Sequence, residues 1–157
     1  MVGTEVEQRG RGDRGARGAQ GGGQSVEARR LVEAFYDAFN RADREAYRAF
    51  LHPDFAAHIS GEGEVSGHMD REAFSRMVFE RVGEVFPGGL QVEIESLIAE
   101  GDRVASQVSV RGRTRRGRAY RNPACHVFRL RDGCIAEMVE YFDTQLSRSA
   151  FDEAAEG

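Results

Sequence analysis

The chain has 157 residues, a length that suits one domain, with 40% hydrophobic and 31% charged residues. No apolar run approaches the roughly 18 residues that a membrane helix needs, and the N-terminus lacks the apolar segment of a signal peptide. We therefore expect a cytoplasmic protein with no membrane partner. All 22 basic residues are arginine and the formal net charge is −4, which argues against nucleic acid as a partner.

The N-terminal segment, residues 1–24, is rich in glycine and arginine. It has too little apolar surface to offset the entropy lost on ordering, so we expect a disordered tail. The arginine-glycine repeats leave open an association with RNA, whose affinity would fall steeply with salt. We expect one ordered domain over 25–146 and a polar C-terminal tail over 147–157 that frays.

Helical patterns occupy the first half of the ordered region. Apolar residues that recur every four positions predict a helix over 26–41. Asp43 and Asp70 are typical N-caps for a second, short helix and for a third helix that ends near Val85. Between these two helices, a short strand over 55–59 leads into a glycine-rich loop.

The second half of the chain changes to the alternating pattern of strands. Strands are predicted over 90–100 and 103–113, and a hairpin is predicted around Asp132-Gly133, a dipeptide typical of two-residue turns. Helices followed by an antiparallel meander indicate an α+β fold. We expect a curved antiparallel sheet wrapped around three N-terminal helices.

The predicted hairpin separates its side chains into two faces. A two-residue turn pairs Leu130 with Ile135, and side chains alternate outward from that pair. One face then holds Asn122, His126, Phe128, Leu130, Ile135, Glu137, Val139, Tyr141 and Asp143. The other holds Cys125, Val127, Arg129, Met138, Glu140 and Phe142. The first face is apolar near the turn and polar far from it, which is typical of a pocket floor. The second is a candidate dimer surface.

Three side chains are candidates for catalysis. A carboxylate in an apolar pocket is a usable acid or base near neutral pH, which favours Asp143; alternatively, Asp143 caps a strand end or pairs with an arginine. His126 could donate a hydrogen bond to a substrate carbonyl, or it could be a core histidine bonded to Glu137 or Tyr141. His58, in the first strand, is a third candidate.

The remaining expectations concern the pocket lining and bound groups. Ligand-binding candidates are Tyr141, Asn122, Tyr120, Phe35, Phe39 and Phe128. We expect no metal, because the chain has no HxH or HExxH motif, although His58, His126 and Asp143 together remain an open alternative. We expect no cofactor, because no GxGxxG motif opens a βαβ unit.

Four stretches carry a resemblance to a known family: FYDAFNRADREAYRAFLHPDF, GEGEVSG, IAEGDRVASQVSVRGR and VFRLRDGCIAEMVEYFDT. Over about residues 26–146 the chain resembles the nuclear transport factor 2-like superfamily, and within it the SnoaL-like polyketide cyclases and ketosteroid isomerase relatives. The resemblance implies a cone with a pocket for a hydrophobic small molecule, and a homodimer through the outer sheet face.

The same resemblance bears on the catalytic groups. In SnoaL-like cyclases an aspartate near the end of the last strand acts as the base, and Asp143 looks like that position. The tyrosine and aspartate of ketosteroid isomerases fall on Phe35 and Ile59, so that mechanism does not carry over. We expect cofactor-independent proton transfer, a cyclisation or isomerisation, on a hydrophobic carbonyl compound. The alternative is a non-catalytic ligand-binding or dimerisation module whose cone is filled by phenylalanines.

Overall fold

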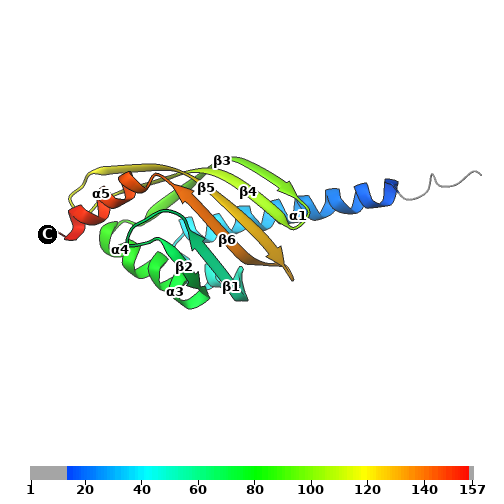
Figure 1. The fold of residues 1–157 in the computed structure, drawn as a ribbon, viewed down its shortest axis with the longest axis horizontal. Helices are drawn as coiled ribbons and strands as arrows, with labels where there is room; N and C mark the ends of the chain where they lie inside the picture. The colour runs from blue at the N-terminus through cyan, green and yellow to red at the C-terminus, as the bar shows by residue number, and fades with distance from the viewer. Residues whose placement is uncertain (1–13, 156–157) are drawn as a thin grey trace, which may run out of the picture.

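A long N-terminal helix, α1 (Arg14–Asn40), runs along the inner side of the sheet and extends beyond it (Figure 1). The computed structural model describes residues 14–155. The start of α1 at Arg14 lies within the segment 1–24 for which a tail is expected. Residues 1–13 lie outside the described residues. The predicted helix over 26–41 corresponds to the part of α1 that packs on the sheet.

Two aspartates begin the next helices, as the sequence predicts. The backbone N–H of Ala46 donates to Asp43 at the start of α2 (Arg44–Ala49), and that of Ala73 donates to Asp70 at the start of α3 (Arg71–Arg76). The third helix continues through a π-helical turn, η1 (Met77–Arg81), into α4 (Val82–Val85). Such turns often occur at functional sites.

A six-stranded sheet curves around these helices, in the order β2-β1-β6-β5-β4-β3. Its strands are β1 (Leu51–Ile59), β2 (Gly67–Asp70), β3 (Leu90–Glu100), β4 (Arg103–Arg113), β5 (Ala119–Arg131) and β6 (Cys134–Phe142). Neighbours are antiparallel except for β1 and β6, which are parallel. The sheet is therefore mixed, not purely antiparallel. No hairpin joins β1 to β6, so no turn fixes their relative direction.

Aromatic packing joins the helices to the concave face of the sheet. The ring of Phe35 on α1 stacks on Tyr47 of α2 at 4.6 Å and meets Phe128 of β5 edge-on at 5.9 Å. All three side chains are buried. Edge-to-face and offset pairs of this kind add to the free energy gained from area burial. The α+β cone expected from the sequence is confirmed.

The C-terminal segment is a helix, α5 (Thr144–Ala155), and not the expected polar tail. Its residues Ala150 and Phe151 are buried in a second apolar cluster with Val85 and Phe86. Its apolar positions are few, which is why composition alone suggested fraying. Tertiary contacts with α4 supply the stabilisation that local propensity lacks.

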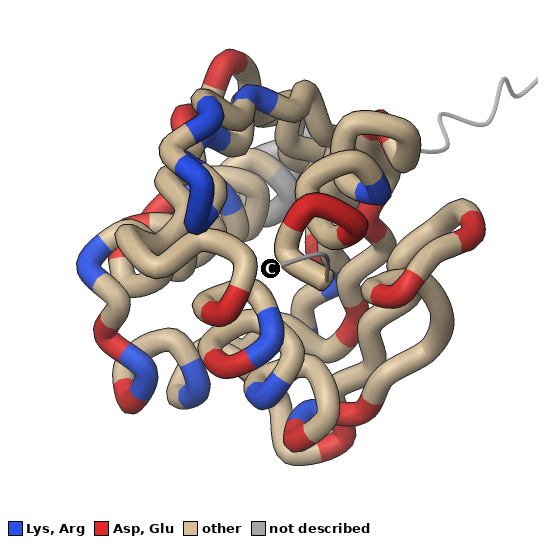
Figure 2. Tube along the Cα trace, turned by 90° about the vertical axis from the view of Figure 1, so that its left-hand side faces the viewer, with Lys and Arg blue, Asp and Glu red and all other residues tan. Residues whose placement is uncertain are grey.

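The surface carries charges of both signs. Viewed from the α5 end, acidic and basic positions are interspersed around the periphery of the fold (Figure 2). In the part of the chain that the structure describes, no helix has both the length and the apolar character that crossing a membrane requires.

Candidate functional site

The register of the β5–β6 hairpin decides which side chains face the interior. The turn is as predicted: Asp132 and Gly133 both have positive φ, at 53° and 72°, and Leu130 pairs with Ile135. Arg129, however, pairs with Glu137, which leaves Ala136 as an extra residue on β6. A bulge of this kind changes the alternation of side chains beyond it.

The predicted faces are therefore right for β5 and wrong for β6 beyond Ile135. Residues Met138, Glu140 and Phe142 point to the interior, and Glu137, Val139 and Tyr141 point outward, as their burial indicates. His126 is thus opposite Glu140, where Val139 was expected. Tyr141 is 52% exposed and does not line the pocket.

Asp143 lies outside the pocket. Its carboxylate Oδ1 accepts hydrogen bonds from the backbone N–H groups of Gln145 at 2.9 Å and Leu146 at 3.2 Å, and the side chain is exposed. This is the geometry of an N-cap, here of α5. The expected position of Asp143 on the pocket floor is wrong.

His58 lies on the outer face of β1, because Phe55, Ala57 and Ile59 occupy the inner face. Its ring stacks on His68 of β2 with centroids 4.2 Å apart. His58, His126 and Asp143 are therefore not neighbours. Within residues 14–155, no three or more His, Cys, Asp or Glu side chains are grouped so as to hold a metal ion.

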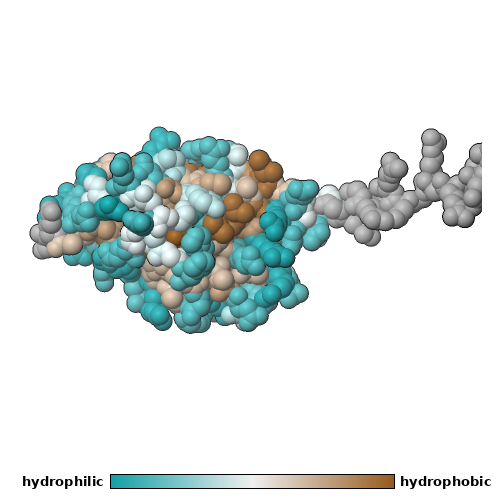
Figure 3. Space-filling model, in the orientation of Figure 1, coloured by the Kyte–Doolittle hydropathy of each residue, from teal (hydrophilic) through white to brown (hydrophobic). Residues whose placement is uncertain are grey.

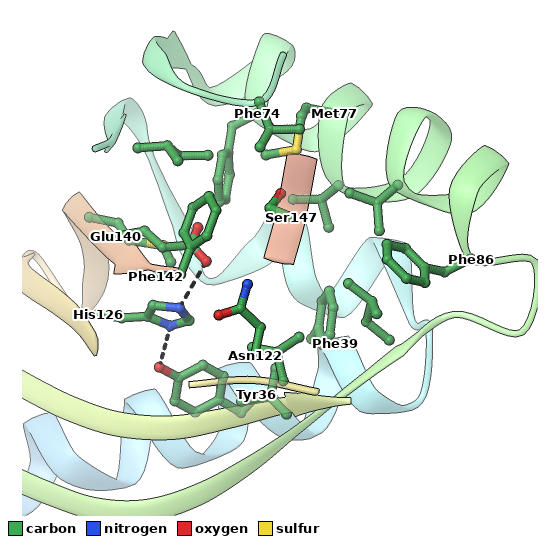
Figure 4. A pocket seen from close by; sticks show the side chains of 18 of the residues that line it. Tyr36, Phe39, Phe74, Met77, Phe86, Asn122, His126, Glu140, Phe142 and Ser147 are labelled. Atoms are coloured by element: carbon green, nitrogen blue, oxygen red, sulfur yellow. Dashed lines mark hydrogen bonds and ion pairs between the residues drawn. The ribbon is translucent and has the colours of Figure 1, made fainter. Parts of the chain in front are cut away.

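A largely apolar cavity of about 120 Å³ lies between the sheet, α1, the third helix and α5 (Figure 4). Its lining residues are Phe35, Tyr36, Phe39, Tyr47, Ile59, Val65, Phe74, Met77, Val78, Val82, Phe86, Leu90, Val92, Val110, Tyr120, Asn122, His126, Met138, Glu140, Phe142, Ser147 and Phe151. The volume is close to that of cavities that hold one benzene ring. Four expected lining residues are present, namely Phe35, Phe39, Tyr120 and Asn122. Phe128 instead packs behind the lining, against Phe35 and Tyr36.

One polar group in this cavity is a hydrogen-bonded chain centred on His126. Its Nδ1 lies 2.7 Å from the Tyr36 hydroxyl, and its Nε2 lies 3.1 Å from Oε1 of Glu140 (Figure 4). The Tyr36 hydroxyl also lies 2.5 Å from the hydroxyl of Ser106. The four side chains come from α1, β4, β5 and β6, so only the assembled fold brings them together.

Sequence reasoning missed Tyr36, Ser106 and Glu140. Tyr36 follows Val32 by four positions, so it lies on the buried side of α1, a signal that the Phe35–Phe39 spacing obscured. Ser106 alternates with Val104 and Val108 on the inner face of β4. Glu140 was assigned to the outer face because the bulge at Ala136 has no sequence signature.

The other polar group joins Asn122, Tyr120 and Ser147. The Asn122 amide donates to the Tyr120 hydroxyl at 2.8 Å and to the Asp143 carbonyl at 2.9 Å, and it accepts from the Asp143 N–H. Burial raises the pKa of Tyr120, partly offset by its hydrogen bond with Asn122. Burial also raises the pKa of Tyr36. Both phenols are therefore neutral hydroxyl groups near pH 7.

Among the described residues that line the cavity, Glu140 is the one carboxylate, and none is an arginine. A carboxylate beside an imidazole in apolar surroundings has the composition of an acid–base site. Exposed fractions of 5% for the His126 side chain and 20% for Glu140 show that only Glu140 has appreciable open surface.

A second cavity of about 160 Å³ adjoins the first. Both are lined by Val65, Phe142, Ser147 and Phe151, so these side chains form the partition between them. The second cavity lies between the glycine-rich loop and α5.

Comparison with known proteins gives a family and a fold. A family model described as a SnoaL-like domain matches residues 32–138. No curated protein matches the chain. Among solved structures, Bal32a from a soil-derived mobile gene cassette is similar with a TM-score of 0.74 and 21% identity, covering 82% of this chain and 98% of Bal32a.

Two further solved structures carry names that suggest an activity. One is IdmH from Streptomyces antibioticus, proposed to be a polyketide cyclase. It has a TM-score of 0.66 and 24% sequence identity, and the match covers 80% of this chain and 98% of IdmH. The other is an LEH-like epoxide hydrolase from M. tuberculosis. It has a TM-score of 0.65 and 24% sequence identity, and the match covers 83% of this chain and 93% of the hydrolase. At such identities the likeness shows the fold alone.

Proposed function

Because the chain belongs to the SnoaL-like domain family, we propose that its cavity binds a hydrophobic carbonyl compound and catalyses cofactor-independent proton transfer, an isomerisation or a cyclisation. The family and the fold do not select the chemistry, since one fold hosts many activities. The proposal rests on the Glu140–His126–Tyr36 chain in an otherwise apolar cavity.

Glu140 is the base in this proposal. Its Oε1 is held by His126, so Oε2 is available to take a proton from the carbon next to the substrate carbonyl. The electron pair of the broken C–H bond becomes the C=C bond of an enolate, and negative charge develops on the carbonyl oxygen. Return of the proton at another carbon completes an isomerisation. In a cyclisation the enolate carbon instead attacks a second carbonyl, whose oxygen gains the electron pair of the C=O bond and takes the proton back from Glu140.

Tyr120 and Ser147 are the groups that we assign to the carbonyl oxygen. Tyr120 accepts a hydrogen bond from Asn122, which makes its own O–H a better donor, and both hydroxyls lie at the cavity. A fixed hydroxyl donor stabilises the oxygen more as it gains charge than in the ground state. Asn122 is itself held by the backbone of Asp143, so the donor is positioned before substrate arrives.

Hydrogen–deuterium exchange tests the proposal without knowledge of the natural substrate. Cyclohexanone and the bicyclic 1-tetralone would be incubated with the protein in D₂O, and deuterium at the α-carbon would be followed by NMR. We expect faster exchange with the wild-type protein than in buffer, and a loss of about 100-fold or more in E140Q, because a general base contributes that much.

Two matched variants separate Glu140 from its neighbours. Glu137 lies on the outer face of the same strand, and Asp143 caps α5, so E137Q and D143N should keep the wild-type exchange rate within about twofold. An E140Q protein that exchanges as fast as wild type would refute the assignment, and a D143N protein that loses exchange would restore the position expected from the sequence.

The small cavity supports a second candidate, a non-catalytic binding module. Ligand sites usually exceed about 300 Å³, whereas this one is about 120 Å³ and phenylalanines form much of its wall. In that case cyclohexanone would raise the thermal unfolding temperature while α-proton exchange stayed at the buffer rate. A homodimer through the outer sheet face belongs to either proposal.

A further inference from the structure

Tyr36, Ser106 and His126 form a closed loop of contacts that the proposed chemistry leaves unexplained. The Tyr36 hydroxyl contacts both the Ser106 hydroxyl at 2.5 Å and Nδ1 of His126 at 2.7 Å, and the Ser106 hydroxyl reaches the backbone carbonyl of His126 at 3.4 Å. As whole residues, these three are 3%, 0% and 4% exposed. Buried polar groups are hydrogen-bonded almost without exception, and the loop itself supplies a partner for each of these groups.

The loop has two complete hydrogen-bond arrangements. With neutral His126, Nε2–H donates to Glu140, Nδ1 accepts from Tyr36, and Tyr36 accepts from Ser106. With the imidazolium, Nδ1–H donates to Tyr36, Tyr36 donates to Ser106, and Ser106 donates to the His126 carbonyl. A hydroxyl is both donor and acceptor, so rotation of two O–H bonds converts one arrangement into the other.

We propose that Tyr36 and Ser106 are positioning residues that form a reversible hydrogen-bond relay, which lets the buried His126 be either neutral or cationic and gives Glu140 a charged partner inside the apolar cavity. The two states differ by one proton, exchanged with solvent, and neither leaves a buried donor unsatisfied. The inference rests on the proposed function for its purpose, but the relay itself requires no substrate.

The other titratable groups around His126 and Glu140 do not determine the charge of His126. Those that interact with this pair electrostatically are Tyr36 of α1, Tyr47 of α2, Tyr120 of β5 and Glu140 of β6, together with Cys125, which lies on the outer face of β5. Burial raises the pKa of the three tyrosines, so they stay neutral. Glu140 is thus the charge that favours the imidazolium, and the Tyr36–Ser106 pair is the acceptor chain for its second N–H.

NMR titration of the four histidines tests the relay. When Nδ1 of His126 carries a proton, the Tyr36 hydroxyl needs an acceptor for its own proton, and S106A removes that acceptor. S106A therefore disfavours the imidazolium form of His126 but not its neutral form. We expect His126 to titrate about one pH unit lower in S106A, a tenfold change in its protonation equilibrium. His52, His58 and His68 lie outside the loop and should titrate as in the wild type.

Three further variants make the test specific. S109A removes another buried serine of β4, whose hydroxyl accepts from Arg111 and Arg121 instead, and it should leave the titration of His126 unchanged. S106T keeps the hydroxyl and should restore the wild-type titration. Because Ser106 acts through Tyr36, Y36F/S106A should shift His126 no further than Y36F alone.

The outcomes distinguish the relay from the catalytic proposal. An unchanged His126 titration in S106A, or additive shifts in the double variant, would overturn the relay whatever the exchange assay gives. If His126 titrates at lower pH in S106A while E140Q exchanges α-protons as fast as wild type, the relay is supported and the proposed reaction is refuted.

Discussion

Each face of the β5–β6 hairpin carries a glutamate, but one glutamate lies in an apolar cavity and the other lies at the exposed surface. On the inner face Glu140 meets a buried histidine at 3.1 Å, in a cavity lined by phenylalanines. On the outer face Glu137, three residues earlier, is 57% exposed and reaches Arg129 at 3.5 Å. A surface pair of this kind contributes little to stability, because both charges keep most of their hydration.

The difference shows that environment, not residue type, selects the functional carboxylate. Glu137, Glu140 and Asp143 all lie within seven residues, and a single extra residue at Ala136 determines which of them reaches the cavity. Four predictions test this contrast, and those with the strongest expected effect come first.

Insertion of one alanine between Glu137 and Met138 should exchange the two faces of β6 beyond it. Met138 and Phe142 would move outward, and Val139 and Tyr141 would move into the core. Loss of two large apolar side chains from the interior costs about 5 kcal/mol or more, comparable with the whole stability of a small domain. Urea unfolding should show no cooperative native state, whereas deletion of Ala136, which removes the bulge but keeps Arg129 opposite Glu137, should retain one. A stable insertion variant would show that the register is not fixed by core packing.

Truncation on the inner face of β5 should cost far more than truncation on the outer face. Phe128 is 1% exposed and contacts Phe35, Tyr36 and His126, so F128A should lose about 3–5 kcal/mol of unfolding free energy. Val127 is the adjacent residue, half-buried on the outer face, so V127A should lose only about 1 kcal/mol of unfolding free energy. Equal losses in chemical denaturation would contradict the assignment of the faces.

The attachment of α5 should weaken in acid. Hydrogen bonds from Thr114 and then Arg118 lower the pKa of Glu153 below its ordinary value of 4.5. Such a group stabilises the fold above pH 4.5, and the contribution is lost as the pH falls through the lower, folded-state value. E153Q should therefore have a lower Tm than wild type at neutral pH, and the two melting curves should converge in strong acid. D152N, at the neighbouring exposed position of the same helix, serves as the matched control. A Tm difference independent of pH would refute the ionic origin of the attachment.

The outer face should mediate dimer formation with little effect on the fold of each chain. One cross-strand row there holds Ile98, Ala105, Val127, Val139 and His58. Apolar surface is visible over the sheet in the space-filling view (Figure 3). An aspartate in an apolar interface is desolvated without a partner. I98D should therefore reduce the mass measured by light scattering from twice 17.4 kDa to 17.4 kDa. A wild-type monomer, or a dimeric I98D, would contradict this role.

Local chemistry by itself determined most of the fold. The caps Asp43 and Asp70, the Asp132-Gly133 turn and the inner face of β5 are all as the sequence predicts, because each depends on residues within a few positions of one another. Asn122, Tyr120, Phe35 and Phe39 line the cavity as predicted for the same reason: their faces follow from short-range periodicity.

The tertiary structure alone decided the site. The bulge at Ala136 is set by packing β6 against both β5 and β1, and no local signal marks it. It put Glu140 in the cavity, turned Tyr141 outward and left Asp143 as the cap of a helix that packs against α4. The Tyr36–His126–Glu140 chain likewise joins residues up to 104 positions apart, from Tyr36 to Glu140, and contacts at that separation depend on the assembled sheet.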